Sequence, residues 1–343
     1  MAVARHDRFD PDLLAFFYSR PRPHRPQWQN RCNRLIRIEV FGGKRIMRSL
    51  KWTMAMFLLA GSGIAFSQER SEPSAGFAIA PQYDTTHVYV SPAEVDVFVK
   101  SFLGTFGGTS TKQVVATVTP TPSSTTSQLL QTPVGTVSLF GFTTPIPANF
   151  GDERNGYLIT DMNSAVAAAR QAGADVVVAT FRDPIGLDAI VQWPGGVKMQ
   201  LYWHFTSPSY APFRHIPENR VYISGDRADA FVRSFLAFSH GQVVSDDAQA
   251  PGIEIGRPEA AYRRIRIESN FGKMQVLVTD GHLPYPYGRE NTGYEVDDLE
   301  ATLKKAQSLG VGILVAPFVS EERKSAIVQF PGGYVAEIHS TAH

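Results

Sequence analysis

The chain has 343 residues, of which 43% are hydrophobic and 19% are charged, and its formal net charge is +1. This length and composition predict a globular protein with room for two domains, each with its own core. The near-neutral charge gives no electrostatic reason to expect nucleic acid or an anionic membrane as a partner. The single cysteine, Cys32, lies in a basic N-terminal stretch, so the rest of the chain has no disulfide or thiolate metal site.

The N-terminal region has the pattern of an export signal. Residues 1–46 contain ten Lys and Arg against four Asp and Glu, and we expect a disordered extension or a stretch preceding the true start at Met47. A basic segment, an apolar run to Phe66 and then Ser67 predict a signal peptide over 47–67. The apolar run is too short to span a bilayer of about 30 Å, although an uncleaved membrane anchor is the alternative. We therefore predict a periplasmic or secreted protein that has no membrane segment after cleavage.

Strand and helix patterns begin after a leader over 68–84. Residues 87–90 predict a strand, and Pro92 opens a helix whose apolar residues, from Val95 to Leu103, recur at helical spacing. Residues 114–118 and 135–142 predict two strands. The polar stretch 119–127 between them is expected to be a surface loop.

The next unit follows the same order. Residues 157–160 predict a strand, Asp161 is a typical N-cap for a second helix, and Gly173 ends that helix. Three strands are then predicted, over 176–181, 188–193 and 197–205.

The second half of the chain repeats the first. Asp161 is followed by Gly173 after twelve residues and by Pro194-Gly195-Gly196 after thirty-three, and Asp298 is followed by Gly310 and Pro331-Gly332-Gly333 at the same spacings. This repetition predicts a strand, a helix and three strands, used four times. The predicted domains cover 85–207 and 219–343, and a proline-rich linker over 208–218 joins them.

A βαβββ unit used four times in two pairs resembles the vicinal oxygen chelate superfamily, which includes glyoxalase I, bleomycin-resistance proteins and extradiol dioxygenases. The residues that carry the resemblance are His87-Val-Tyr-Val, the helix starts at Asp161 and Asp298, Phe181-Arg-Asp-Pro-Ile-Gly, Trp193-Pro-Gly-Gly and Phe330-Pro-Gly-Gly. The resemblance covers 85–340. It implies an α+β fold in which four βαβββ units form two cupped mixed β-sheets with the helices outside. It indicates the fold more specifically than the activity, because such folds host unrelated reactions.

The resemblance also implies a divalent metal, held by residues of the first, fifth and last strands, typically two His and one Glu. The matching residues here are His87, Arg154 and Gln200 in the first half, and Arg220, Asn291 and Glu337 in the second. Neither half has the full set, because Arg is a permanent donor and cannot ligate a cation.

Some members of the superfamily build one cup from both halves, and that arrangement would bring His87 together with Glu337. His339 lies two residues after Glu337, on the same strand face. The resemblance therefore implies a site for Zn, Mn, Ni or Fe held by His87, Glu337 and His339, with Glu337 as the catalytic group. In the structural alternative, His87 is an ordinary buried histidine and Glu337 pairs with Arg or Lys.

Candidate substrate-binding residues lie on one strand and one loop. Tyr202 and His204 share a strand face, which lines the cup or faces solvent depending on a one-residue register shift. The loop over 279–288 carries His282, Tyr285 and Tyr287 between prolines, and it either presents aromatic faces to a ligand or is a rigid connection. Arg220 is a further candidate, in a cationic pocket opposite the metal.

Three classes of function remain open. The first is an exported, metal-dependent lyase, isomerase or dioxygenase that acts on a small molecule with vicinal oxygens. The second is a metal-free small-molecule-binding protein similar to the bleomycin-resistance proteins, and the third is a scaffold that has lost the site. A small molecule is the expected ligand, and the expected state is a monomer with internal pseudo-twofold pairing or a homodimer. The sequence has no glycine-rich phosphate loop, Gly-x-Ser-x-Gly elbow or His-Glu-x-x-His motif.

Overall fold

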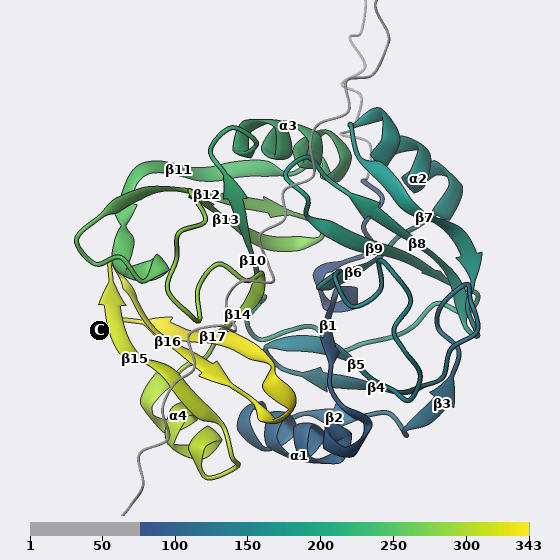
Figure 1. Ribbon diagram of the computed structural model, residues 1–343, viewed down its shortest axis with the longest axis horizontal. Coiled ribbons are helices and arrows are strands. Elements are labelled where there is room, and N and C mark those ends of the chain that lie inside the picture. Colours follow the sequence, from purple (N-terminus) through teal and green to yellow (C-terminus); the bar gives the residue numbers. More distant parts are fainter. Residues whose placement is uncertain (1–75, 343) are drawn as a thin grey trace, which may run out of the picture. The chain divides into compact units, whose positions relative to one another are not determined.

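The computed structural model describes residues 76–342 (Figure 1). The predicted extension over 1–46, the signal peptide over 47–67 and the beginning of the 68–84 leader lie outside the described residues. No helix within 76–342 has both the length and the apolar character needed to cross a membrane.

The first half of the described chain forms one mixed sheet in the order β2-β4-β5-β1-β6-β9-β8-β7, and β3 pairs with β4. Its strands are β1 (Thr85–Tyr89), β2 (Thr109–Ser110), β3 (Val114–Ala116), β4 (Thr125–Thr132), β5 (Gly135–Phe142), β6 (Asn155–Leu158), β7 (Asp175–Arg182), β8 (Gly186–Gln192) and β9 (Lys198–His204). Its helices are α1 (Val95–Phe106) and α2 (Met162–Gln171). Short 3₁₀ turns cover Pro81–Tyr83 (η2) and Pro92–Glu94 (η3).

The second half forms a separate sheet in the order β11-β12-β13-β10-β14-β17-β16-β15. Its strands are β10 (Glu218–Ser224), β11 (Gln242–Pro251), β12 (Ala261–Ser269), β13 (Gly272–Thr279), β14 (Asn291–Glu295), β15 (Gly312–Ser320), β16 (Arg323–Gln329) and β17 (Val335–Thr341). Its helices are α3 (Ala228–Ser239) and α4 (Leu299–Gln307), and its 3₁₀ turns are η4 (Gly252–Ile255) and η5 (Pro331–Gly333).

In all four units the first strand lies parallel to the last: β1 to β5, β6 to β9, β10 to β13 and β14 to β17. A parallel pair needs a crossover connection, and the helix of each βαβββ unit provides part of it. The predicted fold class is therefore confirmed: the protein is α+β, with two curled mixed sheets.

The predicted helix caps are also present. The Asp161 carboxylate accepts a hydrogen bond from the Ser164 N–H at 2.8 Å, and the Asp298 carboxylate accepts one from the Ala301 N–H at 2.9 Å.

The polar stretch 119–127 is only partly a loop, so this prediction is wrong for its last residues. β4 begins at Thr125 and pairs with β5 along its whole length, up to Thr132 opposite Gly135. Only Leu130 of this strand enters the hydrophobic core, so its sequence carries little of the apolar alternation that marks a strand.

The two halves share their hydrophobic cores. Helix α1 packs beside α4 (Figure 1). Phe102 lies 5.2 Å from Phe330 and 5.6 Å from Tyr294, measured between ring centroids. At the other end α2 meets α3, where Trp193 of the first half lies 5.7 Å from Phe235 of the second. Each helix layer therefore combines one helix from each half.

The sheets themselves are not shared. Every strand of the first sheet lies between residues 85 and 204, and every strand of the second lies between 218 and 341. In each sheet one face lies away from the helices. We call this face of the first sheet, β1 to β9, the first cup, and this face of the second sheet, β10 to β17, the second cup. A cup built from strands of both halves is not present, because strands β1 and β10 each pair within their own half.

Candidate functional site

The first cup contains a cavity of about 310 Å³. Alternate residues of β9 point to its two sides: Gln200, Tyr202 and His204 line the cavity, whereas Leu201 enters the core behind the sheet. The aromatic residues in its wall are Tyr89, Phe140, Phe142, Phe150, Tyr202 and Tyr210. Tyr89 stacks on Phe140 at 5.2 Å between ring centroids and on Phe142 at 6.2 Å, so one wall is an aromatic surface.

The buried polar centre of this cavity is Glu153. Its Oε1 accepts a hydrogen bond from the Tyr89 hydroxyl and lies 3.4 Å from His87 Nδ1. Its Oε2 has no hydrogen-bond partner, although Glu153 and His87 are each only 2% exposed. Burial, together with the Glu153 charge, raises the pKa of Tyr89 well above its ordinary value, so Tyr89 stays a donor.

Two further titratable groups line the same cavity. Burial, reinforced by the charge of Asp183, raises the pKa of Asp188 well above its ordinary value and favours its protonated form. Burial lowers the pKa of His204 and favours the neutral imidazole. The cavity therefore combines apolar walls with several polar groups that can orient a ligand.

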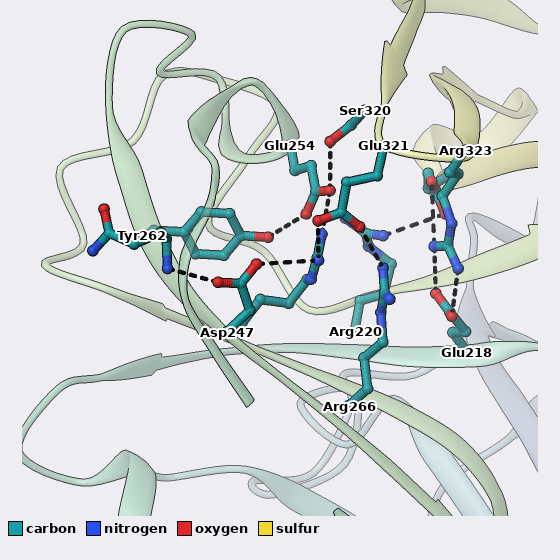
Figure 2. A network of polar contacts seen from close by, with 12 residues as sticks. Glu218, Arg220, Asp247, Glu254, Tyr262, Arg266, Ser320, Glu321 and Arg323 are labelled. Carbon is teal, nitrogen blue, oxygen red and sulfur yellow. Dashed lines mark hydrogen bonds and ion pairs between the residues drawn. The ribbon is translucent and has the colours of Figure 1, made fainter. Parts of the chain in front are cut away.

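The second cup is filled by charged side chains instead (Figure 2). Arg264 is 1% exposed and pairs with Glu254 and, at 2.8 Å, with Glu321. Glu254 also accepts hydrogen bonds from the Tyr262 hydroxyl and, at 2.7 Å, from the Ser320 hydroxyl. This network joins η4, β12 and the β15–β16 turn across the cup.

A second ion-pair group lies beside it. Arg323 donates to both carboxylate oxygens of Glu218, at 2.7 Å each, and Arg220 Nη1 lies 3.4 Å from Glu337 Oε2. The same Glu337 oxygen lies 2.9 Å from His339 Nδ1. A charged cleft of about 470 Å³ remains at this edge, and Glu218, Arg323 and His339 are among the residues that line it.

Apolar residues close the rest of the second cup. Ala250, Ile255, Tyr262 and Leu277 form a buried cluster, with Tyr222 and Leu283 packed against it. The Tyr287 hydroxyl donates to the Ile253 carbonyl at 3.4 Å. η4 and the 283–287 loop thus occupy the region that corresponds to the aromatic wall of the first cup.

Strand register shows why the two cups differ in their side chains. His87 pairs with Ser138 as Arg220 pairs with Gln275, so His87 and Arg220 hold equivalent positions. By the same comparison Ser127 corresponds to Arg264 and Leu129 to Arg266, because these residues face equivalent positions of β5 and β13. Gly186 corresponds to Arg323, opposite His204 and Thr341. Each of these four arginines has a shorter, uncharged or weakly basic counterpart in the first half.

One group in the second cup has the donor types of a metal site. Ligand atoms of Glu218, Glu337 and His339 lie within 4.8 Å of one another, and this set could hold a divalent metal ion. However, Arg323 already takes both oxygens of Glu218, and Arg220 stands beside Glu337. The two guanidinium groups compensate both carboxylates, so the residues as arranged here do not fit a resident metal.

The predicted site residues fall into separate places. Glu337, His339 and Arg220 are brought together, whereas His87 lies in the first cup against Glu153. Tyr202 and His204 line the cavity of the first cup.

The residues of the proline-rich loop do not converge on either cavity. The side chain of His282 is 88% exposed, and Tyr285 is 69% exposed. Tyr287 packs against η4, where its ring lies beside Gly256. His282 and Tyr285 therefore lie on an exposed surface loop, whereas Tyr287 covers part of the second cup.

The sequence analysis missed Asp188, whose counterpart in the second half is Ser325, and it missed Glu153, although the second half has Glu290 at the same spacing from its helix cap. It named Arg220 but missed Arg264, Arg266 and Arg323, although Tyr262-Arg-Arg-Ile-Arg-Ile alternates charge with apolar residues and places Arg264 and Arg266 on one strand face.

No family model and no curated protein matches this sequence. Solved structures do match. A triple mutant of 4-hydroxymandelate synthase from Streptomyces coelicolor aligns with a TM-score of 0.53 and 13% identity over 78% of this chain and 94% of that chain. A xylose isomerase-like TIM barrel/4-hydroxyphenylpyruvate dioxygenase fusion protein aligns with a TM-score of 0.50 and 12% identity over 78% of this chain and 50% of the fusion. These similarities confirm the vicinal oxygen chelate fold.

The Glu218–Arg323 pair predicts how stability depends on pH. Burial alone would raise the pKa of Glu218, but the Arg323 guanidinium outweighs it and lowers the pKa from 4.5 to about 2. The pair therefore stabilises the fold above pH 4.5, and this stabilisation, about 3 kcal/mol at most, is lost as the pH falls toward 2. In urea unfolding between pH 6 and 2, we expect Glu218→Gln to start less stable and to lose less stability than the wild type. Parallel losses in both proteins would contradict the assignment.

Proposed function

We propose that this chain is an exported protein that binds a small organic molecule in the first cup without using a metal ion. The observation that carries the proposal is the 310 Å³ cavity, which has aromatic walls and several buried polar groups. Ligand sites in proteins are typically concave and mostly apolar, with a few polar groups that fix orientation, and about 300–1,000 Å³ in volume. Because strands of one half alone build the first cup, the site needs no second chain, and a monomer is the proposed binding unit.

The second half supports this function as a scaffold. Its cup is occupied by ion pairs and by η4, and its helices complete the cores on which the first sheet rests. The first half is thus the copy that binds the ligand. The second half, whose cup contains the ion pairs, is the structural copy.

A side chain that fills the cavity should abolish binding. Ser127 lines the first cup at the position where the second cup holds Arg264, so Ser127→Trp places an indole inside the cavity. We expect saturation-transfer NMR with rigid aromatic fragments of neutral, cationic and anionic types to find ligands of the wild type. Their affinity should fall at least about tenfold in Ser127→Trp.

The matched control is Val115→Trp, which adds the same side chain to a 75% exposed position of the same sheet. This variant should bind like the wild type. The proposal is wrong if no fragment binds the wild type or if Ser127→Trp binds as well as Val115→Trp does.

A metal-dependent enzyme is the second candidate, and the Glu218, Glu337 and His339 group is the observation that favours it. We expect elemental analysis of the protein, after exposure to Zn, Mn, Ni or Fe(II), to find no stoichiometric ion, because Arg220 and Arg323 neutralise the carboxylates. One ion per chain that is lost in His339→Ala and kept in His87→Ala would establish a metal site in the second cup. Loss in His87→Ala would instead place the ion in the first cup, where His87 lies against Glu153.

Export is proposed from the basic segment at Met47 and the apolar run before Ser67. When the chain is expressed from Met47 in a bacterial host, we expect the periplasmic or secreted form to begin at Gln68 by N-terminal sequencing. An uncleaved chain in the membrane fraction would support the membrane-anchor alternative.

A further inference from the structure

We infer that the ligand of the first cup is an organic cation, a molecule with a protonated nitrogen on an aromatic or aliphatic body. This inference rests on the proposed function and names the class of molecule that the cavity selects.

The charges in the cavity wall have one sign. Glu153, Asp183 and Asp188 line the cavity, Asp188 in the protonated form that burial favours, whereas none of the residues that line it is Lys or Arg. An anionic ligand would meet Glu153 and Asp183 in a region of low dielectric, where like charges repel strongly. A cationic ligand would meet the opposite charge.

In the second cup three carboxylates are paired with guanidinium groups. There Glu218 pairs with Arg323, Glu254 with Arg264, and Glu337 with Arg220. A buried carboxylate without a partner is costly, so each of these groups has its own guanidinium.

The first cup lacks those guanidinium groups at the equivalent positions. His87, Ser127, Leu129 and Gly186 stand where the second half has Arg220, Arg264, Arg266 and Arg323. His87, Ser127 and Leu129 line the cavity, so the space that their three arginine counterparts take in the second cup is part of the cavity in the first. A bound cation would fill this space and provide the positive charge that arginine side chains provide in the second cup.

Glu153 is the group that would receive the cation. Its Oε1 is occupied by the Tyr89 hydroxyl and His87, and its Oε2, although buried, has no donor. A ligand N–H placed at Oε2 would complete the hydrogen bonds of this carboxylate and form a charge-assisted bond.

The aromatic wall suits the same ligand. Tyr89, Phe140 and Phe142 form a stacked surface next to His87, and Tyr89 also donates to Glu153. Ring faces attract cations, most strongly where water is excluded. The nitrogen would therefore lie between Glu153 and these rings, and the apolar body would extend toward Val114, Val118 and Leu129.

Three probes of one shape test the inference. 1-Naphthylmethylamine, 1-naphthylmethanol and 1-naphthoic acid share a ring body and differ in charge. In calorimetric titrations of the full chain at neutral pH, we expect the amine to bind at least about tenfold more tightly than the alcohol. The acid should bind more weakly than the alcohol.

Glu153→Gln keeps the shape of the side chain and removes its charge. In this variant the amine should fall to the affinity of the alcohol, and unchanged alcohol binding would show that the cavity is intact. The matched control is Asp152→Asn, the same loss of charge at the neighbouring, exposed carboxylate, which should leave the preference for the amine unchanged.

The outcomes separate the two proposals. If the alcohol or the acid binds the wild type as tightly as the amine, or if Glu153→Gln keeps the preference, the cation inference is wrong and the proposed function stands. If none of the three binds and the fragment screen is also empty, the proposed function is wrong as well. Should Glu153→Gln fail to fold, the order of the three affinities in the wild type decides.

Discussion

A guanidinium group can be buried only where carboxylates or carbonyls accept its hydrogen bonds, and this requirement distinguishes the two cups. Arg264 is almost inaccessible to solvent, and Glu254 and Glu321 bind it from η4 and from the turn between β15 and β16. These contacts hold three separate segments across the second sheet and leave only a charged cleft at its edge. The first sheet has the same strand order around its centre but no buried arginine, so its concave face stays open.

The closed cup and the open cup have different roles in the function we propose. A metal centre needs ligands with free lone pairs, whereas Arg220 and Arg323 engage the carboxylates of the second cup. The cavity of the first cup offers carboxyl groups, neutral histidine and aromatic rings instead. The shared fold with a 4-hydroxymandelate synthase structure is therefore compatible with a different use of the site, since a fold does not fix an activity.

Much of the architecture could be predicted from the sequence. The four βαβββ units could be predicted from helical spacing, from the N-caps at Asp161 and Asp298 and from the repeat, because these signals lie in the sequence itself. The polar strand β4 gave no such signal, and the assignment of strands to sheets depends on long-range pairing that periodicity does not encode. The face of β9 that carries Tyr202 and His204 could be grouped by alternation. The contact of Glu153 with His87 could not be predicted, because these residues are far apart in sequence and only the folded chain places the segment before β6 beside β1.

The shared cores have an evolutionary consequence. Each helix layer combines α1 with α4 or α2 with α3, so a chain with only one half would have to pair with an identical copy to cover Phe102 or Phe235. In such a homodimer every substitution appears twice, and both cups open or close together. Gene fusion removes that constraint: one copy can acquire arginines while the other keeps a vacant interior. The contrast between Ser127 and Arg264 is therefore a difference that an ancestor made of two identical chains could not have had.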